Sequence, residues 1–252
     1  MIKIVDLHKS FDGHRVLEGV NLEIRDGETL TIIGGSGCGK SVLLKHIVGL
    51  MKPESGQVYI EDQEITSMEE DERAEVQKKF GMLFQGAALF DSLTVGENIG
   101  FGLRNIGNFS NEKINLIVAE KLSRVGLSGI EELKPAELSG GMRKRVGLAR
   151  AIACEPQYIL YDEPTTGLDP IMADVINDLI VHLQKELKVT SIVVTHDMKA
   201  AYKVSNRLAM LYEGKIIALG TPEEIRTSRS PLVQQFISGS SQGPIKMKVK
   251  EW

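Results

Sequence analysis

Two hydrophobic patterns alternate along this chain, and together they predict strands of two kinds. Up to about residue 33, apolar and polar positions alternate with a period of two, as in IKIVDL and RVLEGVNLEI. This period is typical of antiparallel strands with one buried face. TLTII (29–33), YILYD (158–162) and SIVVT (191–195) are instead continuous apolar runs. Such runs predict parallel strands that are buried on both faces.

Further segments predict hairpins and helices. GQVYIEDQEI and RLAMLYEGKIIALG are each expected to form a hairpin, with turns near Asp62-Gln63 and Glu213-Gly214. From about residue 90 to 155 the period becomes helical, and one helix is expected to begin after a cap at Ser110. Its buried face contains Ile114, Ile117, Val118, Leu122 and Val125. The mixture predicts an α/β fold with a parallel core sheet, an antiparallel β subdomain and an α-helical subdomain.

A glycine-rich loop joins the first buried strand to a helical run. GGSGCGKS (34–41) fits the pattern G-x-x-x-x-G-K-[ST] through Gly34, Gly39, Lys40 and Ser41. Glycines let backbone N–H groups approach phosphate oxygens closely, and the helix that follows adds its positive end. Lys40 is expected to reach the β and γ phosphates, and Ser41 to bind Mg²⁺. The loop predicts a nucleoside triphosphate site but leaves kinase, GTPase, helicase and transport ATPase open.

Composition narrows the class of protein further. With 252 residues, of which 42% are hydrophobic, the chain can bury the core of one sizeable domain. A formal net charge of −4 and a pI near 5.8 argue against nucleic-acid binding. The two cysteines, Cys38 and Cys154, are far apart in sequence, which predicts a reducing compartment without a structural disulfide. We interpret Cys38 as a small residue that fills the loop.

Nothing in the sequence predicts membrane insertion. The N-terminal MIKIVDLHKSF lacks the features of a signal peptide, and no window holds 18 uninterrupted apolar residues. We therefore expect a soluble protein whose contact with any membrane goes through a partner.

Acidic residues after two buried strands indicate hydrolysis. Asp162 and Glu163 follow one strand in tandem; the first suits a Mg²⁺ partner and the second suits activation of water. LSGGM, with Ser139 opening a helix, provides a second candidate anion site about twenty residues earlier. TTGLDP with Asp169 and VVTHD with His196 follow. Ser-Gly-Gly alone is a weak signal, but its combination with an Asp-Glu strand is specific.

This set of motifs resembles the nucleotide-binding subunit of ABC transporters over residues 1–228, with a helical subdomain at about 90–155. The resemblance makes 34–41 the Walker A loop, LSGGM the signature motif, and Asp162 the Walker B aspartate. It implies that Glu163, His196 and Gln85 are catalytic, and that Ser41, Gln85 and Asp162 bind Mg²⁺. Met142 departs from the glutamine that is commonest after the glycines. ATP contacts are implied for Phe11, Val16, Gly34, Gly35, Ser36, Gly37, Cys38, Gly39, Lys40, Ser41, Val42, Ser139, Gly140, Gly141 and Asp169.

The same resemblance implies a head-to-tail homodimer with two ATP molecules between the protomers. Each ATP contacts Lys40 of one chain and Ser139 of the other. Phe11, 29 residues before Lys40, matches the aromatic residue that stacks on adenine, where tyrosine is more usual. The alternative for Phe11 is a plain strand-core residue.

Three segments resemble one ABC subfamily, the ATPases of Mla/Mce-type lipid transporters (the MlaF group). They are FQGAALFDSLTVGENI, LSGGMRKRVGLARAI and the C-terminal PLVQQFISGSSQGPIKMKVKEW. The resemblance implies an MlaE-type permease, an MCE-domain protein and a STAS-domain (MlaB-like) protein as partners. It also implies a peripheral location on the cytoplasmic face of the bacterial inner membrane. The sequence leaves the cargo and the direction of transport open.

The C-terminal extension, 229–252, keeps several apolar residues within a polar segment. A disordered tail rarely keeps so many, so we predict that it docks on the partner protomer or on the STAS subunit. A frayed terminus is the alternative. The apolar residues are Phe236, Ile237, Ile245, Met247, Val249 and Trp252.

Three other functions are weighed against lipid transport. An ABC subunit for another cargo would show the same core motifs, so only its partners would discriminate. A non-transport ABC protein usually carries a long coiled-coil insertion or a second cassette, and neither is present in this sequence. A regulatory subunit with inactive sites is disfavoured because the residues for binding and hydrolysis are intact.

Overall fold

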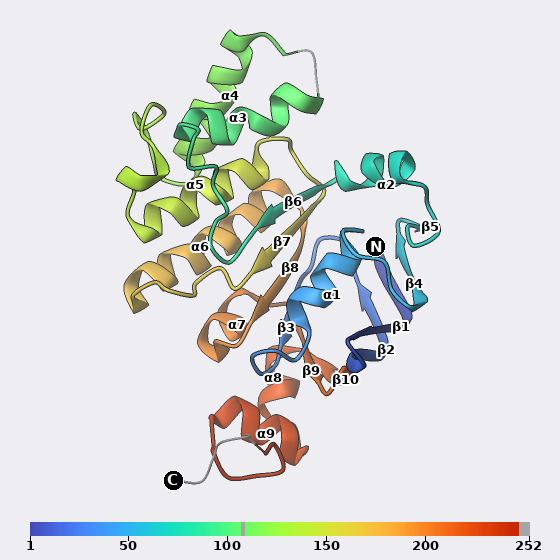
Figure 1. The fold of residues 1–252 in the computed structure, drawn as a ribbon. Helices are drawn as coiled ribbons and strands as arrows, with labels where there is room; N and C mark the ends of the chain where they lie inside the picture. The colour runs from blue at the N-terminus through green and yellow to red at the C-terminus, as the bar shows by residue number, and fades with distance from the viewer. Residues whose placement is uncertain (107–108, 247–252) are drawn as a thin grey trace.

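The computed structural model describes residues 1–106 and 109–246, which form two sheets with helices around them (Figure 1). The larger sheet has the strand order β10-β9-β3-β8-β7-β6 and is parallel except for the β9–β10 pair. Its strands are β3 (Thr29–Ile33), β6 (Phe80–Leu83), β7 (Tyr158–Asp162), β8 (Thr190–Thr195), β9 (Arg207–Tyr212) and β10 (Lys215–Gly220). The smaller sheet is antiparallel, with the order β2-β1-β4-β5. Its strands are β1 (Ile2–Phe11), β2 (His14–Ile24), β4 (Ser55–Ile60) and β5 (Gln63–Glu64).

The helices gather around the larger sheet, and those of the region 90–155 form a separate group beside it (Figure 1). That group packs together through α3, α4 and α5, as the sequence predicts. Its elements are α3 (Val95–Ile106), α4 (Asn111–Arg124), the 3₁₀ turn η1 (Pro135–Glu137) and α5 (Gly140–Ile152). The other helices are α1 (Lys40–Ile47), α2 (Glu70–Gln77), α6 (Pro170–Leu187), α7 (Met198–Val204), α8 (Pro222–Arg226) and α9 (Pro231–Ser238).

The buried strands, the helix cap and the hairpins predicted from the sequence are confirmed. Strands β3 and β8 are buried at every position, as continuous apolar runs predict. Ser110 caps α4 by accepting a hydrogen bond from the Lys113 amide at 3.3 Å. Both expected hairpins form, and Glu213 and Gly214 take the positive φ angles that their tight turn requires.

Three apolar clusters stabilise these layers. One lies between the two sheets around α1, and a second lies between the larger sheet and the helices α3 to α6. The third joins β9 to α7, α8 and α9, with Val233 fully buried. Within the described residues, no helix combines the length and the apolar character that a membrane span needs.

The C-terminal segment packs in part on its own chain. Phe236, Ile237 and Ile245 are half-buried against the third cluster, and their predicted contact with a partner stays a prediction. The buried amide of Gln235 donates to the carbonyls of Ser240 (3.2 Å) and Ile245 (3.0 Å) and accepts from the Ile245 amide at 2.6 Å. Burial of apolar area within the chain explains this arrangement. Met247, Val249 and Trp252 lie outside the described residues.

Candidate ATP-hydrolysis site

The glycine-rich loop leaves β3 and turns into α1 through positions that only glycine fits. A Cβ atom on Gly34 would lie 2.4 Å from the carbonyl oxygen of Leu211. Gly39, which precedes the helix, has φ 104°, and a Cβ there would lie 2.9 Å from Val16. Because both positions exclude side chains, the loop can curve around a phosphate with its amides facing inward.

A cavity of about 440 Å³ opens between this loop and the ends of strands β7 and β8. Residues predicted for the ATP site line it together, although they come from five separate parts of the chain. They are Val16, Ser36, Gly37, Gly39, Lys40, Ser41, Val42, Gln85, Glu163 and His196. Cys38 instead faces a neighbouring cavity, and burial raises the pKa of its thiol, which agrees with a space-filling residue.

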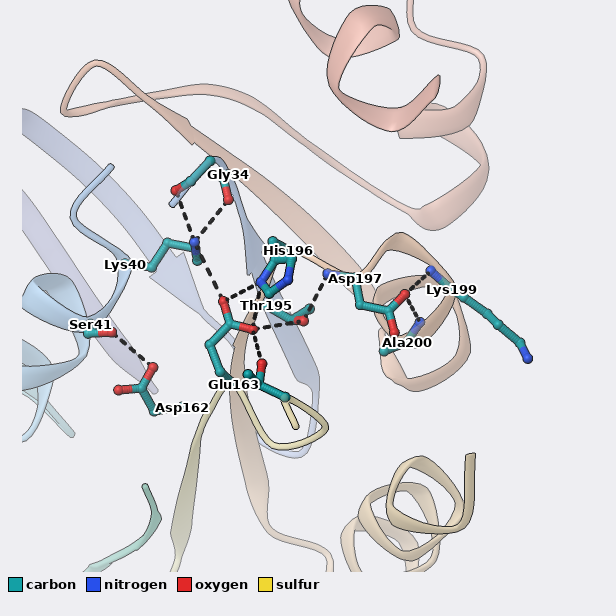
Figure 2. Close-up of polar contacts among 12 residues, drawn as sticks. Gly34, Lys40, Ser41, Asp162, Glu163, Thr195, His196, Asp197, Lys199 and Ala200 are labelled. Atoms are coloured by element: carbon teal, nitrogen blue, oxygen red, sulfur yellow. Dashed lines mark hydrogen bonds and ion pairs between the residues drawn. The ribbon is translucent and has the colours of Figure 1, made fainter. Parts of the chain in front are cut away.

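Lys40 is buried and its ammonium is held by the loop itself (Figure 2). It donates to the carbonyls of Gly34 at 2.9 Å and Gly35 at 3.1 Å, and it lies 3.7 Å from a carboxylate oxygen of Glu163. A buried cation needs such partners because desolvation is costly. Phosphate oxygens entering the cavity can therefore replace Glu163 as the anionic neighbour of Lys40.

Glu163 is buried at the centre of the site (Figure 2). Its carboxylate accepts hydrogen bonds from Thr166 Oγ1 at 3.2 Å and Thr195 Oγ1 at 3.4 Å, and it lies 3.0 Å from His196 Nδ1. Its backbone has φ 47°, a left-handed conformation that is costly for a residue other than glycine. A carboxylate held this tightly beside the phosphate loop is placed to accept a proton from water.

Ser41 and Asp162 form the second polar pair. The Ser41 hydroxyl donates to Asp162 Oδ1 at 2.9 Å (Figure 2). Burial raises the pKa of Asp162, and the hydrogen bond from Ser41 opposes that shift. Exposed Gln85 lines the same cavity. One carboxylate, one hydroxyl and one amide suit Mg²⁺, which keeps water and phosphate oxygens as its other ligands.

Other predicted residues lie outside this cavity. Ser139 is exposed and caps α5 by accepting from the Met142 amide at 3.2 Å, with Gly140 beginning the helix and Gly141 buried in its first turn. Asp169 is exposed and caps α6. The ring of Phe11 is 41% exposed, with the Lys9 ammonium 5.4 Å from its centroid, so it is a surface residue and not strand core.

The structure adds residues that motif reasoning did not single out. Thr195 and Thr166 donate hydrogen bonds to the Glu163 carboxylate. Both lie inside motifs that the sequence analysis quotes, VVTHD and TTGLDP, but neither was assigned a role there. Lys144, in the basic stretch after LSGGM, donates to main-chain carbonyls of Gln85 and Glu163. The sequence offers no signal for Lys144, because it lies in the charged run RKR.

The family model described as ABC transporter matches residues 17–166, more than half of the chain. The chain belongs to the ABC transporter family. It is an ATP-hydrolysing subunit, and its cavity is lined by the loop, Glu163 and the histidine that such a reaction needs. The match covers both the phosphate loop and the Asp162-Glu163 pair.

Several curated relatives are similar over nearly the whole chain. The chloroplastic protein trigalactosyldiacylglycerol 3 of Arabidopsis thaliana is 44% identical over 98% of this chain and 76% of its own length. MlaF of Haemophilus influenzae, an intermembrane phospholipid transport ATP-binding protein, is 42% identical over 94% of this chain and 90% of its own. Mkl of Mycobacterium leprae, named as a probable ribonucleotide transport protein, is 42% identical over 98% and 71%.

Solved structures agree with the fold. The dimeric ATP-binding cassette MJ0796, in a post-hydrolysis state with ADP and phosphate, matches with a TM-score of 0.82. It is 33% identical over 88% of this chain and 99% of that chain. The predicted ABC ATPase fold is therefore confirmed.

Proposed function

We propose that this subunit uses ATP hydrolysis to drive phospholipid transport between bacterial envelope membranes. The convergence of Lys40, Ser41, Gln85, Glu163 and His196 on one cavity carries the ATPase part of the proposal. The cargo rests on similarity, because MlaF is named for phospholipid transport and is covered over 90% of its length. The Arabidopsis relative bears the name of a galactolipid.

The reaction uses the groups of the cavity in turn. The loop amides and Lys40 bind the phosphates of ATP, and Glu163 orients the attacking water and accepts its proton. His196, hydrogen-bonded to Glu163, faces the γ-phosphate, and Phe11 and Val16 contact the adenosine. Mg²⁺ would be held by Ser41, Gln85 and Asp162, where it would neutralise charge on the phosphates.

Dimerisation completes the site. Ser139 and Asp169 are exposed and do not line the cavity of their own chain, although both cap helices whose N-termini favour anions. A head-to-tail pair would place Ser139, Gly140 and Gly141 of one protomer on the ATP of the other. The dimeric state of MJ0796 supports this arrangement. Closing on two ATP molecules and opening after hydrolysis would supply the transport stroke.

The partners proposed are an MlaE-type permease, an MCE-domain protein and a STAS-domain protein, at the cytoplasmic face of the inner membrane. The test is purification of the tagged chain from detergent-solubilised membranes, followed by mass spectrometry of proteins and lipids. A permease, an MCE protein and bound phospholipid are expected. A different permease with a protein that binds a soluble substrate would contradict the lipid proposal and leave the ATPase intact.

A second cargo is favoured by one observation. Mkl, named for ribonucleotide transport, is as identical to this chain as MlaF is. Reconstituting the purified complex in vesicles distinguishes the two cargoes. We expect ATP-dependent transfer of labelled phospholipid and no ATP-dependent uptake of labelled ribonucleotide. Uptake of the ribonucleotide without lipid transfer would favour the second cargo.

The Ser41→Ala variant tests the Mg²⁺ site. The variant loses the hydroxyl that donates to Asp162 and that is proposed to bind Mg²⁺. Loss of one ligand should weaken Mg²⁺ binding by about 1.5 kcal/mol or more. We therefore expect the Mg²⁺ concentration for half-maximal ATPase activity to rise about tenfold or more. Ser123→Ala changes an exposed serine of α4 that does not line the cavity; this control should leave the Mg²⁺ dependence nearly unchanged. An unchanged Mg²⁺ dependence in Ser41→Ala would remove Ser41 from the metal site.

Two truncations test the role of the C-terminal extension. We propose that the C-terminal extension docks on the partner protomer or on the STAS subunit, so ending the chain at 238 should weaken assembly. Ending it at 246 tests whether residues 247–252 contribute. Ending it at 238 also leaves the buried Gln235 amide without Ser240 and Ile245. Loss of these hydrogen bonds and of the apolar packing of Ile245 costs about 1–3 kcal/mol, which should lower the melting temperature by roughly 5 °C. Full assembly of the chain ending at 238 would contradict the docking of the extension.

A further inference from the structure

Lys144 links three parts of the site through one buried ammonium. It lies in α5, whose N-terminus carries the signature motif, and only 5% of the residue is exposed. The ammonium donates to the main-chain carbonyl of Glu163 at 3.2 Å and to the main-chain carbonyl of Gln85. Lys144 therefore connects α5, the helix expected to meet the partner's ATP, to two other segments. One contains the proposed base Glu163, and the other contains Gln85, the proposed Mg²⁺ ligand.

The contact with Glu163 falls on a strained peptide. Glu163 is the left-handed residue described above, and its amide donates to the Val194 carbonyl at 3.0 Å. Lys144 holds the carbonyl at the other end of the same residue. A costly backbone conformation persists only where neighbouring contacts fix it. These two bonds fix the direction in which the Glu163 carboxylate leaves the main chain.

The contact with Gln85 is part of a larger attachment between α5 and the loop that follows β6. Arg150, from the same helix, donates to the carbonyls of Ala87 and Ala88, both at 2.7 Å. Ala87 and Ala88 also have positive φ angles. The loop is thus held to α5 by two cations, but of these two only Lys144 also contacts Glu163.

The chemistry of the ammonium supports this bridging position. Burial lowers the pKa of Lys144, and the nearby carboxylates of Asp162 and Glu163 oppose the shift. An ammonium has three donors, so it can bond both carbonyls at once. A buried cation that spends its donors on main-chain carbonyls fixes backbone geometry, because it forms no direct ion pair within 4 Å among the described residues.

We propose that Lys144 is a positioning residue for ATP hydrolysis, which holds the main chain of Glu163 and Gln85 in register with the signature helix. The inference rests on the proposed role of Glu163 as the base. When ATP draws the signature motif of one protomer onto its partner, movement of α5 is transmitted through Lys144 to the base and to the Mg²⁺ amide. Lys144 itself does not touch ATP.

The test compares Lys144→Met with Lys144→Arg in the ATPase purified with its membrane partners. Methionine fills similar space without a donor, so kcat should fall at least 30-fold while KM for ATP changes less than twofold. Arginine restores donors and should return kcat to within threefold of wild type. Lys144→Ser, whose hydroxyl is too short to bridge the carbonyls, replaces the methionine variant if that protein does not fold, with the same expectation.

The matched control is Lys121→Met. Lys121 is a more deeply buried lysine, 2% exposed, which contacts Glu120 and Glu155 away from the cavity. It should lose thermal stability as Lys144→Met does but keep its kcat within twofold. A normal kcat in the donor-free variants of Lys144, or equal losses of kcat at both lysines, would overturn the proposal.

A separate variant distinguishes failure of the inference from failure of its premise. In Glu163→Gln, ATP should still bring two protomers together, and adding Lys144→Met should leave that ATP-driven dimerisation within twofold. If Glu163→Gln turns over normally, the base is misassigned. If it is inactive while Lys144→Met is fully active, only the positioning role is wrong.

Discussion

Replacing Glu163 with glutamine is expected to lower kcat by about 10²- to 10⁴-fold while ATP still binds. General-base catalysis contributes a factor of that size, and an amide cannot accept the proton of the attacking water. Lys40, which is expected to bind the phosphates, is held by the carbonyls of Gly34 and Gly35, and these bonds do not involve the Glu163 carboxylate. ATP should therefore accumulate unhydrolysed and hold the dimer closed, which size-exclusion chromatography with ATP would detect as a stable dimer.

Glu75→Gln is the control for this experiment. The Glu75 side chain is 71% exposed and pairs with Lys78 at the end of α2, so the variant should keep its kcat within twofold of wild type. A Glu163→Gln protein with near-normal turnover would show that another group activates the water. Loss of ATP binding in the variant would instead indicate that Glu163 helps to position Lys40 in the phosphate loop, since its carboxylate lies 3.7 Å from the Lys40 ammonium.

The sequence predicts those parts of the molecule that depend on neighbouring residues. The apolar runs at β3, β7 and β8 need no distant partner to be recognised, because a strand buried on both faces excludes polar residues. The phosphate loop is equally local, since glycine spacing, Lys40 and Ser41 all lie within eight positions. Parallel strands end at one edge of the sheet, which is why Glu163 and His196 meet beside that loop.

Contacts between distant elements could not be predicted in this way. In the sequence, Lys144 is one of three consecutive basic residues, RKR, which are typical of an exposed helix face. Its burial follows from the packing of α5 against β6. The C-terminal extension is a second example. Apolar residues in a polar segment predict that something covers them but not what, and in the structure Phe236 and Ile245 pack partly against the third cluster of the same chain. The contact with a partner stays a prediction. The proposed half of the ATP site around Ser139 would depend on a second copy of the chain, which one chain's contacts do not contain.

Replacing Lys40 with alanine is expected to abolish measurable hydrolysis and to weaken ATP binding at least tenfold. Its ammonium is the only side-chain cation that lines the cavity among the described residues, apart from the titratable ring of His196. A hydrogen bond to a charged group contributes about 1.5–3 kcal/mol, a factor of ten or more in affinity. Loss of a preorganised charge at the transferred phosphate costs a further 10²- to 10³-fold in rate.

Stability measurements separate this effect from misfolding. In the absence of nucleotide, Lys40 contributes bonds to Gly34 and Gly35, while Glu163 keeps Thr166, Thr195 and His196 as neighbours. The melting temperature without ATP should therefore change little, whereas the rise that ATP produces in the wild type should largely disappear, because that rise reports binding to the folded state. Lys45→Ala, an exposed position in the last turn of the same helix, should keep the full ATP-dependent rise. An equally large rise in Lys40→Ala would mean that the loop amides alone bind the nucleotide, and that Lys40 acts only on the chemical step.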